Sequence, residues 1–447
     1  MRRGMCRALL VAAAVLLFIC SCDKRPPTPT EPSPQPFEFD TAPTAPITFL
    51  STQLNPVEEA GKMRTSILRD FPGSVDFRPN DNNWLFNQIE AELKSDHAAA
   101  ILVGALHGDL ARLHEEGALR PLGDLFASLG DRDFPETLAG MSLLDGKEPY
   151  YIPWLQATFV MTANKKALPY LPKGAALDRL TYGELLQWGR TIREKTGKKA
   201  IGFPAGGKGL FHRFFQGYLY PSFTGGTLLP FRGAEARTMW EYFRDLWQVV
   251  QPGSLNYSTM AEPLLAEDVW IAWDHTARLA KVFETRGEDF VAFPAPAGPK
   301  GRGFMSVISG LAIPAAVKDA ENPAILIDYL TRPEIQLRTL RDVGFFPVVR
   351  LKDETGIPEN LRSLSRAVAD QSSSLNPVPT LLPVGLGSRA GDFNALYTLT
   401  FAEIVLEEKD VGSVLDANAA ELQRIIDAEN ARCWLPDRSE ERPCKIE

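Results

Sequence analysis

Two tryptophans and an acid stand close together in the stretch Asp268–Pro314, and these residue types suit the binding of a ring-shaped polar ligand. Trp270 and Trp273 lie in an apolar segment that predicts a strand, and Asp274 follows at its end. We expect both rings on one face of this strand, with Trp273 stacking on the ligand and Asp274 accepting hydrogen bonds from its hydroxyl groups. The alternative is that one or both tryptophans belong to the hydrophobic core.

Other candidate ligand contacts follow predicted strands or interrupt them. They are Gln53 and Asn55 after Ile47–Ser51, His107 after Ala98–Val103, Trp154 and Gln156 within Tyr150–Asn164, Ser309 and Gly310 within Phe304–Pro314, and Phe345 in the turn Gly344–Pro347. Amides, imidazoles and hydroxyls can bond the rim of a polyhydroxylated ligand, and a glycine lets the backbone approach it. Each residue also has a structural interpretation, such as a helix cap for Asn55, hinge packing for Trp154 and core packing for Phe345. His107 could equally be an ordinary surface histidine.

The first part of the folded body alternates strand and helix patterns. Apolar runs at Ile47–Ser51, Val75–Arg78 and Ala98–Val103 predict strands, and amphipathic runs between and after them predict helices. This order favours a parallel sheet, in which ligands bind beyond the carboxyl ends of the strands. The later part adds a capping-box helix that opens at Thr181–Glu184. Because 447 residues are too many for one core, the sequence predicts an α/β protein of two lobes.

The N-terminus has the charged and apolar pattern of a secretory signal. Three arginines flank the start of the apolar run Ala8–Ile19, which is too short to span a bilayer. The run ends in Ile19-Cys20-Ser21-Cys22, which resembles a bacterial lipobox. We therefore predict a signal peptide at 1–21, lipidation of Cys22 and a Pro/Thr-rich tether at 22–45. The alternative is ordinary secretory cleavage without a lipid.

The acidic composition argues against nucleic acid as a partner. The formal net charge is -8, and removal of the signal with its arginines makes it more negative. Binding to the phosphate backbone of a nucleic acid needs a basic surface, so the sequence favours a small-molecule ligand over DNA or RNA.

Two cysteines, Cys433 and Cys444, remain in the mature chain besides Cys22. In an oxidising compartment we expect a disulfide that closes a short loop between them. The alternative is a pair of free surface thiols. A zinc site is not expected, because no histidine lies nearby.

The sequence lacks the motifs that common hydrolases and nucleotide-dependent enzymes need. Gly202–Lys208 matches most of a phosphate-binding loop, but Gly209 stands where that loop needs a serine or threonine for Mg²⁺. No Gly-x-Ser-x-Gly or His-Glu-x-x-His pattern is present. Asp268 and Asp274 could suit glycoside hydrolysis, but a pair of acids is unremarkable in a chain of this length. We expect no catalysis, no cofactor and no metal.

Several short motifs follow one another in a fixed order. They are Leu110–Leu122 (LARLHEEGALRPL), Asp145–Lys165 with Asp-Gly-Lys, Tyr-x-x-Pro and Asn-Lys, Thr181–Leu185, Phe293–Pro314 with its Pro/Gly loop and Ser-Gly strand, and Pro333–Pro347 with Pro-Glu-Ile-Gln and Gly-Phe-Phe-Pro. The ordered set resembles the carbohydrate-type extracellular solute-binding proteins of ABC importers, the family of maltose-binding protein. The chain departs from that pattern at Ala163, where the family often has tyrosine, and at Ser309, where Gly-Gly is usual.

The resemblance implies a two-lobe periplasmic-binding-protein fold of type II. Each lobe would be a mostly parallel sheet flanked by helices, and crossing strands would join the lobes as a hinge. The implied boundaries are 46–154 plus 304–348 for the N-lobe and 155–303 plus 349–447 for the C-lobe. The chain would cross between lobes near Trp154, near Phe304 and at Phe345–Val349.

The resemblance also implies a function. The chain would be a monomeric, lipid-anchored receptor outside the cytoplasm that captures a small solute, expected to be a sugar, and delivers it to an ABC permease. Alternatives are an envelope glycoside hydrolase and a ligand-sensing lipoprotein with the same fold. Simple sugars, oligosaccharides, glycerol-phosphate compounds and polyols all remain open as ligands.

Overall fold

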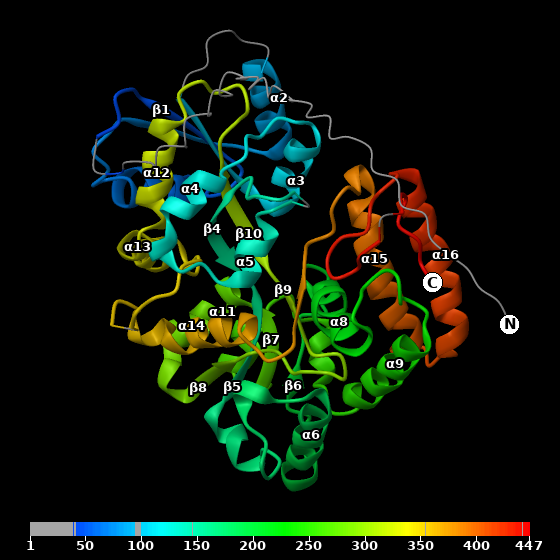
Figure 1. The fold of residues 1–447 in the computed structure, drawn as a ribbon. Helices are drawn as coiled ribbons and strands as arrows, with labels where there is room; N and C mark the ends of the chain where they lie inside the picture. Colours follow the sequence, from blue (N-terminus) through cyan, green and yellow to red (C-terminus); the bar gives the residue numbers. More distant parts are fainter. Residues whose placement is uncertain (1–38, 40–41, 94–99, 145, 354, 440) are drawn as a thin grey trace, which may run out of the picture. The chain divides into compact units, whose positions relative to one another are not determined.

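A computed structural model describes residues 39, 42–93, 100–144, 146–353, 355–439 and 441–447. Cys22, the predicted signal peptide and most of the predicted tether lie outside these residues. The strands are β1 (Ile47–Ser51), β2 (Val75–Pro79), β3 (Ala100–Leu106), β4 (Ile152–Ala157), β5 (Phe159–Asn164), β6 (Ile201–Gly202), β7 (Ile271–His275), β8 (Phe290–Phe293), β9 (Arg302–Met305), β10 (Val307–Ala312) and β11 (Pro377–Thr380) (Figure 1).

Helices surround these strands along the described chain. They are α1 (Val57–Lys62), α2 (Asn82–Leu93), α3 (His107–Glu115), α4 (Gly123–Ser128), α5 (Glu136–Met141), α6 (Tyr182–Thr196), α7 (Phe211–Phe214), α8 (Tyr220–Thr224), α9 (Ala234–Trp247), α10 (Ala261–Leu265), α11 (Thr276–Arg286), α12 (Glu321–Thr331), α13 (Pro333–Val343), α14 (Glu359–Ser372), α15 (Ala390–Phe401) and α16 (Val411–Ala428). A π-helical turn, η5 (Phe215–Leu219), continues α7. None of the helices in the described part of the chain is both long and apolar enough to cross a bilayer.

The predicted capping box at the start of α6 is confirmed. The Thr181 hydroxyl accepts a hydrogen bond from the Glu184 backbone N–H, and the Glu184 carboxylate accepts one from the Thr181 backbone N–H. Gly197 ends the helix with a φ of 75°, a left-handed conformation that glycine adopts without a steric cost. Local sequence signals therefore determine both ends of this helix.

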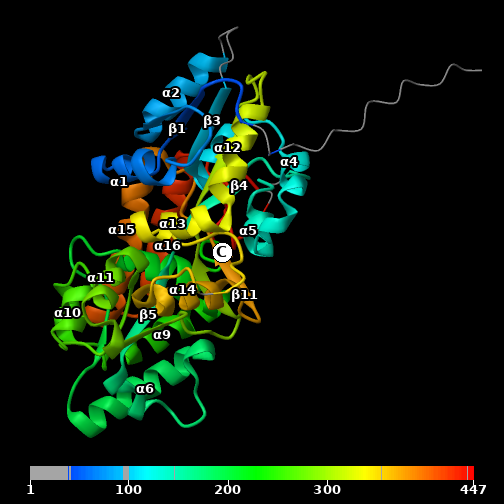
Figure 2. The ribbon, with the colours of Figure 1, turned by 90° about the vertical axis from the view of Figure 1, so that its left-hand side faces the viewer.

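The first sheet has the strand order β2-β1-β3-β10-β4. β1 pairs in parallel with both β2 and β3, which confirms the predicted β-α-β-α-β start. β10 is antiparallel to β3 and to β4, so the complete sheet is mixed. Figure 2 shows α12, far along the sequence, beside these N-terminal strands, and it packs against β3 and β4.

The second sheet has the order β6-β7-β5-β8. β6 and β7 are parallel, but β5 is antiparallel to both β7 and β8. The expectation of a mostly parallel sheet is wrong here for a topological reason. β5 continues the chain away from the first sheet, whereas β7 and β8 run back towards it. Both α11 and α14 pack against strands of this sheet.

The chain passes from the first sheet to the second at Thr158 and returns at Ser306, close to the crossings expected near Trp154 and Phe304. The Thr158 hydroxyl donates to the Met305 carbonyl (2.7 Å), which ties the two crossing strands together. The Gln371 side-chain amide donates to the Thr158 hydroxyl (2.9 Å), and the Tyr218 hydroxyl lies 3.0 Å from it. Burial raises the pKa of Tyr218 to about 12, so its hydroxyl keeps its proton in this network.

The C-terminal segment is fixed to the rest of the fold. Cys433 and Cys444 form the expected disulfide, with 4.8 Å between their Cα atoms. Trp434 packs edge-on against Phe393 of α15. The buried Asp437 carboxylate accepts hydrogen bonds from three successive backbone N–H groups at residues 227–229. These contacts hold the end of the chain against the loop before α9.

Candidate functional site

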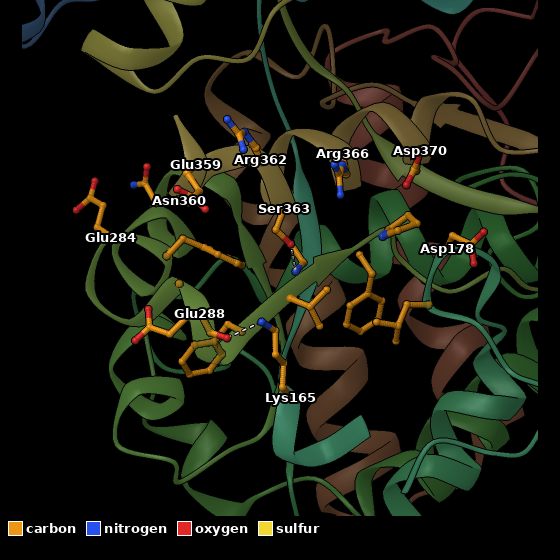
Figure 3. Close-up of a pocket in the computed structure, with 18 residues that line it drawn as sticks. Lys165, Asp178, Glu284, Glu288, Glu359, Asn360, Arg362, Ser363, Arg366 and Asp370 are labelled. Atoms are coloured by element: carbon orange, nitrogen blue, oxygen red, sulfur yellow. Dashed lines mark hydrogen bonds between the residues drawn. The ribbon is translucent and has the colours of Figure 1, made fainter. Parts of the chain in front are cut away.

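A surface groove of about 870 Å³ runs along β8 and α14, at the outer edge of the second sheet (Figure 3). Its charged and amide lining residues are Lys165, Asp178, Glu284, Glu288, Glu359, Asn360, Arg362, Arg366 and Asp370. Ser363 of α14 accepts a hydrogen bond from the backbone N–H of Ala292 and so joins the helix to the edge strand. No residue predicted as a ligand contact lines this groove. Several of the predicted contacts, among them His107, Trp154 and Gln156, lie instead on or beside the crossing strands.

The carboxyl ends of β1 and β3 point towards the crossing strands. β4 runs into the crossing at Thr158, and β10 is antiparallel to both β3 and β4. β3 therefore runs in the same direction as β4, and β1 is parallel to β3. Residues that follow Ser51 and Leu106 consequently lie on the crossing side of the first sheet.

The carboxyl ends of β6 and β7 point towards the same crossing from the second sheet. β7 is antiparallel to β5, and His275 at the end of β7 pairs with Phe159 at the start of β5. β6 is parallel to β7, so the chain that leaves Gly202 also emerges on this side. Strand ends from both sheets therefore converge on one region, as expected for ligand sites in α/β folds.

The register of the strands gives the distance between the two sets of strand ends. Leu106 lies opposite Ser309, which lies opposite Leu155. His275 lies opposite Phe159. Leu155 and Phe159 are four residues apart, and a strand rises about 3.3 Å per residue, so the two ends are separated by roughly 13 Å along the crossing strand.

Polar side chains gather at the end of the first sheet. His107, the first residue of α3, shares a hydrogen bond of 2.9 Å with the Tyr151 hydroxyl through its Nδ1. Asp109, two residues on, accepts a hydrogen bond from the Asn82 side chain (2.6 Å), and burial raises its pKa to about 6. Gln53 follows β1 and is half-buried, with its side chain donating to the neighbouring Thr52 hydroxyl. These groups can donate to and accept from the hydroxyls of a solute.

Gly310 has a structural reason to be glycine. A Cβ atom at this position would lie 2.1 Å from the Tyr151 ring, so the ring occupies the space that a side chain would need. The suggestion that the Gly310 backbone approaches a ligand is therefore replaced by a packing role. Ser309, beside it in β10, is buried between β3 and β4.

His275 is the polar group at the end of the second sheet. Its Nδ1 accepts a hydrogen bond from the Ala277 backbone N–H (3.3 Å) and so caps α11. Burial, and then the positive charge of Arg278, lowers the pKa of His275 to about 4, so the ring is neutral at physiological pH. The proton then resides on Nε2, which donates to no other described residue and is available to a solute.

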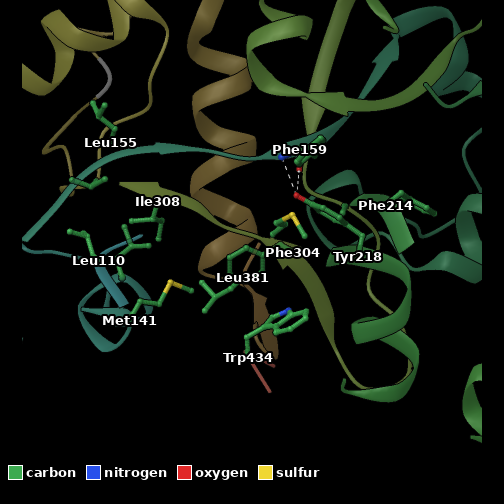
Figure 4. Close-up of a cluster of buried hydrophobic side chains, with 14 of the residues drawn as sticks. Leu110, Met141, Leu155, Phe159, Phe214, Tyr218, Phe304, Ile308, Leu381 and Trp434 are labelled. Carbon is green, nitrogen blue, oxygen red and sulfur yellow. Dashed lines mark hydrogen bonds between the residues drawn. The ribbon is translucent and has the colours of Figure 1, made fainter. Parts of the chain in front are cut away.

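The Trp273 ring is enclosed by other aromatic rings rather than open to a ligand. It is fully buried, stacks on Phe159 with 4.7 Å between ring centroids, and meets Phe214 and Tyr218 edge-on at 5.2 Å. Figure 4 shows Phe159, Phe214 and Tyr218 within the buried cluster. A ligand could stack on Trp273 only by displacing Phe159, so this ring fits a core role.

Asp274 is also enclosed. Its two carboxylate oxygens accept hydrogen bonds from the backbone N–H groups of Met260 (2.8 Å) and His275 (2.7 Å), and its side chain is fully buried. Burial raises its pKa to about 6 against the opposing effect of these bonds. The carboxylate thus joins the end of β7 to the start of α10, which is a structural role.

The predicted shared face of Trp270 and Trp273 is wrong. Side chains alternate along a strand, so residues three apart point to opposite faces. Trp270 also precedes β7 and is half-buried at its amino end, against Tyr170 and between Lys166 and Lys198. It lies at the end of the strand away from His275.

The remaining predicted contacts have structural partners. Trp154 is buried against Phe49 of β1, with ring centroids 5.3 Å apart. The Gln156 side chain donates to the Pro347 carbonyl, and its backbone carbonyl accepts from Phe346, so Gln156 holds the third predicted crossing segment. Phe345 is half-buried against the core. Asn55 is exposed and makes no capping bond, because the N-cap position of α1 is Pro56.

Sequence reasoning missed His275 and Tyr151. The signal for His275 was the one used for His107: a polar residue where a buried strand meets a helix. Tyr151 carried no such signal, because its partner Gly310 is distant in sequence. Among the described residues, no cluster of three or more acidic, histidine or cysteine side chains could hold a metal ion.

Comparisons with known proteins give the family of this chain and agree with its fold. A family model described as bacterial extracellular solute-binding protein matches residues 71–351. Curated protein sequences give no match. Among solved structures, the chain is similar to the sugar-binding protein MalE from the phytopathogen Xanthomonas citri, with 17% identity, a TM-score of 0.67, and coverage of 85% of this chain and 97% of that chain.

Two further solved structures are similar. One is UgpB from Mycobacterium tuberculosis in complex with glycerophosphocholine, with 20% identity, a TM-score of 0.61, and coverage of 87% of this chain and 100% of the other. The second is the bacterial solute receptor AcbH, described as exclusive for β-D-galactopyranose, with 14% identity, a TM-score of 0.66, and coverage of 87% and 99%. The expected two-lobe α/β fold is confirmed by these similarities.

Proposed function

Because this chain belongs to the family of bacterial extracellular solute-binding proteins, we propose that it captures a small solute, expected to be a sugar, between its two lobes and delivers it to an ABC permease. The family consists of binding proteins, so the chain is a receptor and not an enzyme. The lobes in this proposal are 46–154 plus 304–348 and 155–303 plus 349–447.

One observation carries the proposal: strand ends from both sheets converge on the crossing strands. His107 follows β3 and His275 ends β7. The ends of these two strands are roughly 13 Å apart along the crossing strand. Side chains from both ends would span part of that distance and leave room for a small solute. Of the sequence-predicted contacts, Gln53 and His107 stay in the proposal, and His275 is added.

The expectation of a sugar is supported by the similar structures. MalE is described as sugar-binding and AcbH as a galactopyranose receptor, whereas UgpB was determined with glycerophosphocholine. Neutral imidazole, amide and hydroxyl groups at the strand ends suit hydroxyl-rich compounds. Because Trp273 is enclosed, it does not offer the stacking platform that the sequence suggested. The screen described below tests which class of ligand binds.

Anchoring and delivery are part of the same proposal. The lipobox-like sequence before Cys22 and the Pro/Thr-rich stretch up to residue 45 support a lipid anchor with a tether outside the cytoplasm. A tethered receptor would stay close to a membrane permease while its folded body binds solute. We propose that it acts as a monomer.

The test is a thermal-stability screen of residues 22–447 with Cys22→Ala, which prevents lipid attachment. Glucose, galactose, maltose, glycerol and glycerol 3-phosphate would be titrated separately. A receptor should show saturable stabilisation, worth about 2.7 kcal/mol at one hundred times the dissociation constant, with the compound recovered unchanged. Hydrolysis of maltose, the compound of this set that has a glycosidic bond, would favour the glycoside hydrolase alternative.

A sensing lipoprotein would bind solute as a transport receptor does. Uptake of the labelled solute by cells with and without the gene separates the two functions. Loss of uptake supports delivery to a permease, and unchanged uptake with retained binding supports sensing.

A further inference from the structure

Arg213 lies on the ligand side of the second sheet. The chain leaves β6 at Gly202, on the side where the strand ends converge, and enters α7 at Phe211. Gly217, one helical turn after Arg213, packs against Met305 of the crossing strand β9. Residues one turn apart share a face of a helix, so Arg213 lies on the helix face directed to the crossing strands.

The Arg213 guanidinium has no acidic partner among the described residues. Its side chain donates one hydrogen bond, from Nη1 to the Gln216 side-chain oxygen (2.8 Å), although a guanidinium offers five N–H donors. Burial lowers the pKa of Arg213 to about 10, so the group stays positively charged at neutral pH. The flanking rings of Phe211 and Phe214 are buried and offer no counter-charge.

The polar neighbours of Arg213 are neutral. Gln216 is buried, and its amide donates to the Asn394 side chain of α15 (3.0 Å). Burial, and then the charge of Arg213, lowers the pKa of His212 to about 3, so this neighbour is uncharged too. Hydrogen bonds therefore orient the guanidinium while leaving its charge uncompensated.

An uncompensated, partly buried charge is costly, and a bound anion would offset that cost. The planar fork of a guanidinium matches the two oxygens of a carboxylate or phosphate, which neutral hydroxyls match less well. By contrast, the buried Arg132 is paired with the buried Asp328. Arg213 differs from Arg132 in that no carboxylate of a described residue faces its charge.

We propose that Arg213 binds an acidic group of the captured solute, a carboxylate or a phosphate ester, so that the solute is an acidic sugar or polyol. This inference rests on the proposed function and narrows its substrate class. Gln216 holds the guanidinium in place, and His212 can donate to or accept from the same solute as a neutral group.

Matched pairs of compounds test the inference on residues 22–447 with Cys22→Ala. The pairs are glucuronate with glucose, glucose 6-phosphate with glucose, and glycerol 3-phosphate with glycerol. Affinity would be measured by calorimetry for the parent protein, Arg213→Gln, Arg213→Lys and Arg193→Gln. Arg193 is an exposed arginine of α6 and serves as the matched control for loss of one charge.

We expect one acidic member to bind at least tenfold more tightly than its neutral partner. Arg213→Gln should remove that preference, Arg213→Lys should retain part of it, and Arg193→Gln should not change it. The carboxylate and phosphate arms identify the acidic group. Arg213→Gln should also leave the melting temperature of the ligand-free protein unchanged or higher, because it removes an unpaired charge; a purely structural arginine would lower it.

Neutral compounds that bind as well as acidic ones, with affinities that Arg213→Gln leaves unchanged, would overturn the inference and leave the proposed function standing. Binding of none of these compounds or of the neutral sugars in the screen would contradict the proposed function itself.

Discussion

His107 and His275 occupy equivalent places in the two sheets, but their surroundings differ. Each lies where a buried strand meets a helix, β3 with α3 and β7 with α11. His107 shares a hydrogen bond with Tyr151 in a half-buried polar group. His275 lies beside Trp273 and Asp274, which are completely enclosed. In both sheets a histidine lies at the end of the strand, and the strand residues before it build the core.

The largest expected effect tests the core role of Trp273. Trp273→Ala should lower the free energy of unfolding by about 3–5 kcal/mol, because it removes a fully buried ring that stacks on Phe159. Urea denaturation followed by circular dichroism measures the change. A variant that stays as stable as the parent but loses solute binding would instead place Trp273 in the ligand site.

In the first sheet, Gly310→Ala should lower the free energy of unfolding by about 2 kcal/mol, because the new methyl group would meet the Tyr151 ring. Gly61→Ala in α1 is the matched control: its Cβ atom would meet nothing within 4 Å, and alanine favours a helix. Chemical denaturation of both variants gives the comparison. Equal stability of the two would contradict the close packing of Tyr151 on β10.

The pH dependence of stability tests the enclosure of Asp274. Its pKa is raised to about 6 in the folded protein, so between pH 4 and pH 6 the folded state binds more protons than the unfolded state. Asp274 therefore stabilises the fold relatively more at low pH, and that contribution is lost as pH rises through about 6. Between pH 4.5 and pH 7, the free energy of unfolding of the parent should fall by about 2 kcal/mol relative to that of Asp274→Asn. Urea titrations at both pH values measure this difference. A constant difference, or a relative gain, would show that the carboxylate is not desolvated.

The smallest effect is expected at His275. His275→Ala should lower the free energy of unfolding by about 1 kcal/mol, because the capping bond to α11 is long and the half-buried ring has only an edge-on contact with Phe159 besides it. Differential scanning calorimetry is sensitive enough to measure this. A loss of stability as large as that of Trp273→Ala would mean that His275 is a core residue. The strand end would then not differ from the strand interior.

Much of the fold was predictable because its signals are local. The capping box of Thr181 and Glu184, the alternation from β1 to β3 and the disulfide cysteines all act over short stretches. The antiparallel pairing of β5 in the second sheet was not predictable in this way. It depends on β5 continuing out of the first sheet, a relation between distant segments that apolar patterns do not encode.

The place of the proposed site follows from sequence patterns more readily than its residues do. The rule that ligands bind beyond strand ends led to this region and to His107, and both stay predictions. Trp273 and Asp274 misled because an aromatic residue beside an acid suits a ligand site and a core equally well. Arg213 was not singled out, because the absence of an acidic partner is visible only in three dimensions.

The central claim is that one solute contacts strand ends of both sheets. Its most direct test is the affinity for the best solute of the thermal screen, measured by calorimetry for His107→Ala, His275→Ala and the control His114→Ala. His114 lies in the last turn of α3, with its ring tilted against that of Tyr150. The account predicts that His107→Ala and His275→Ala each weaken the same solute by about tenfold, while His114→Ala has little effect. If His107→Ala or His275→Ala leaves the affinity unchanged, the solute does not bridge the two sheets and the proposed site is wrong.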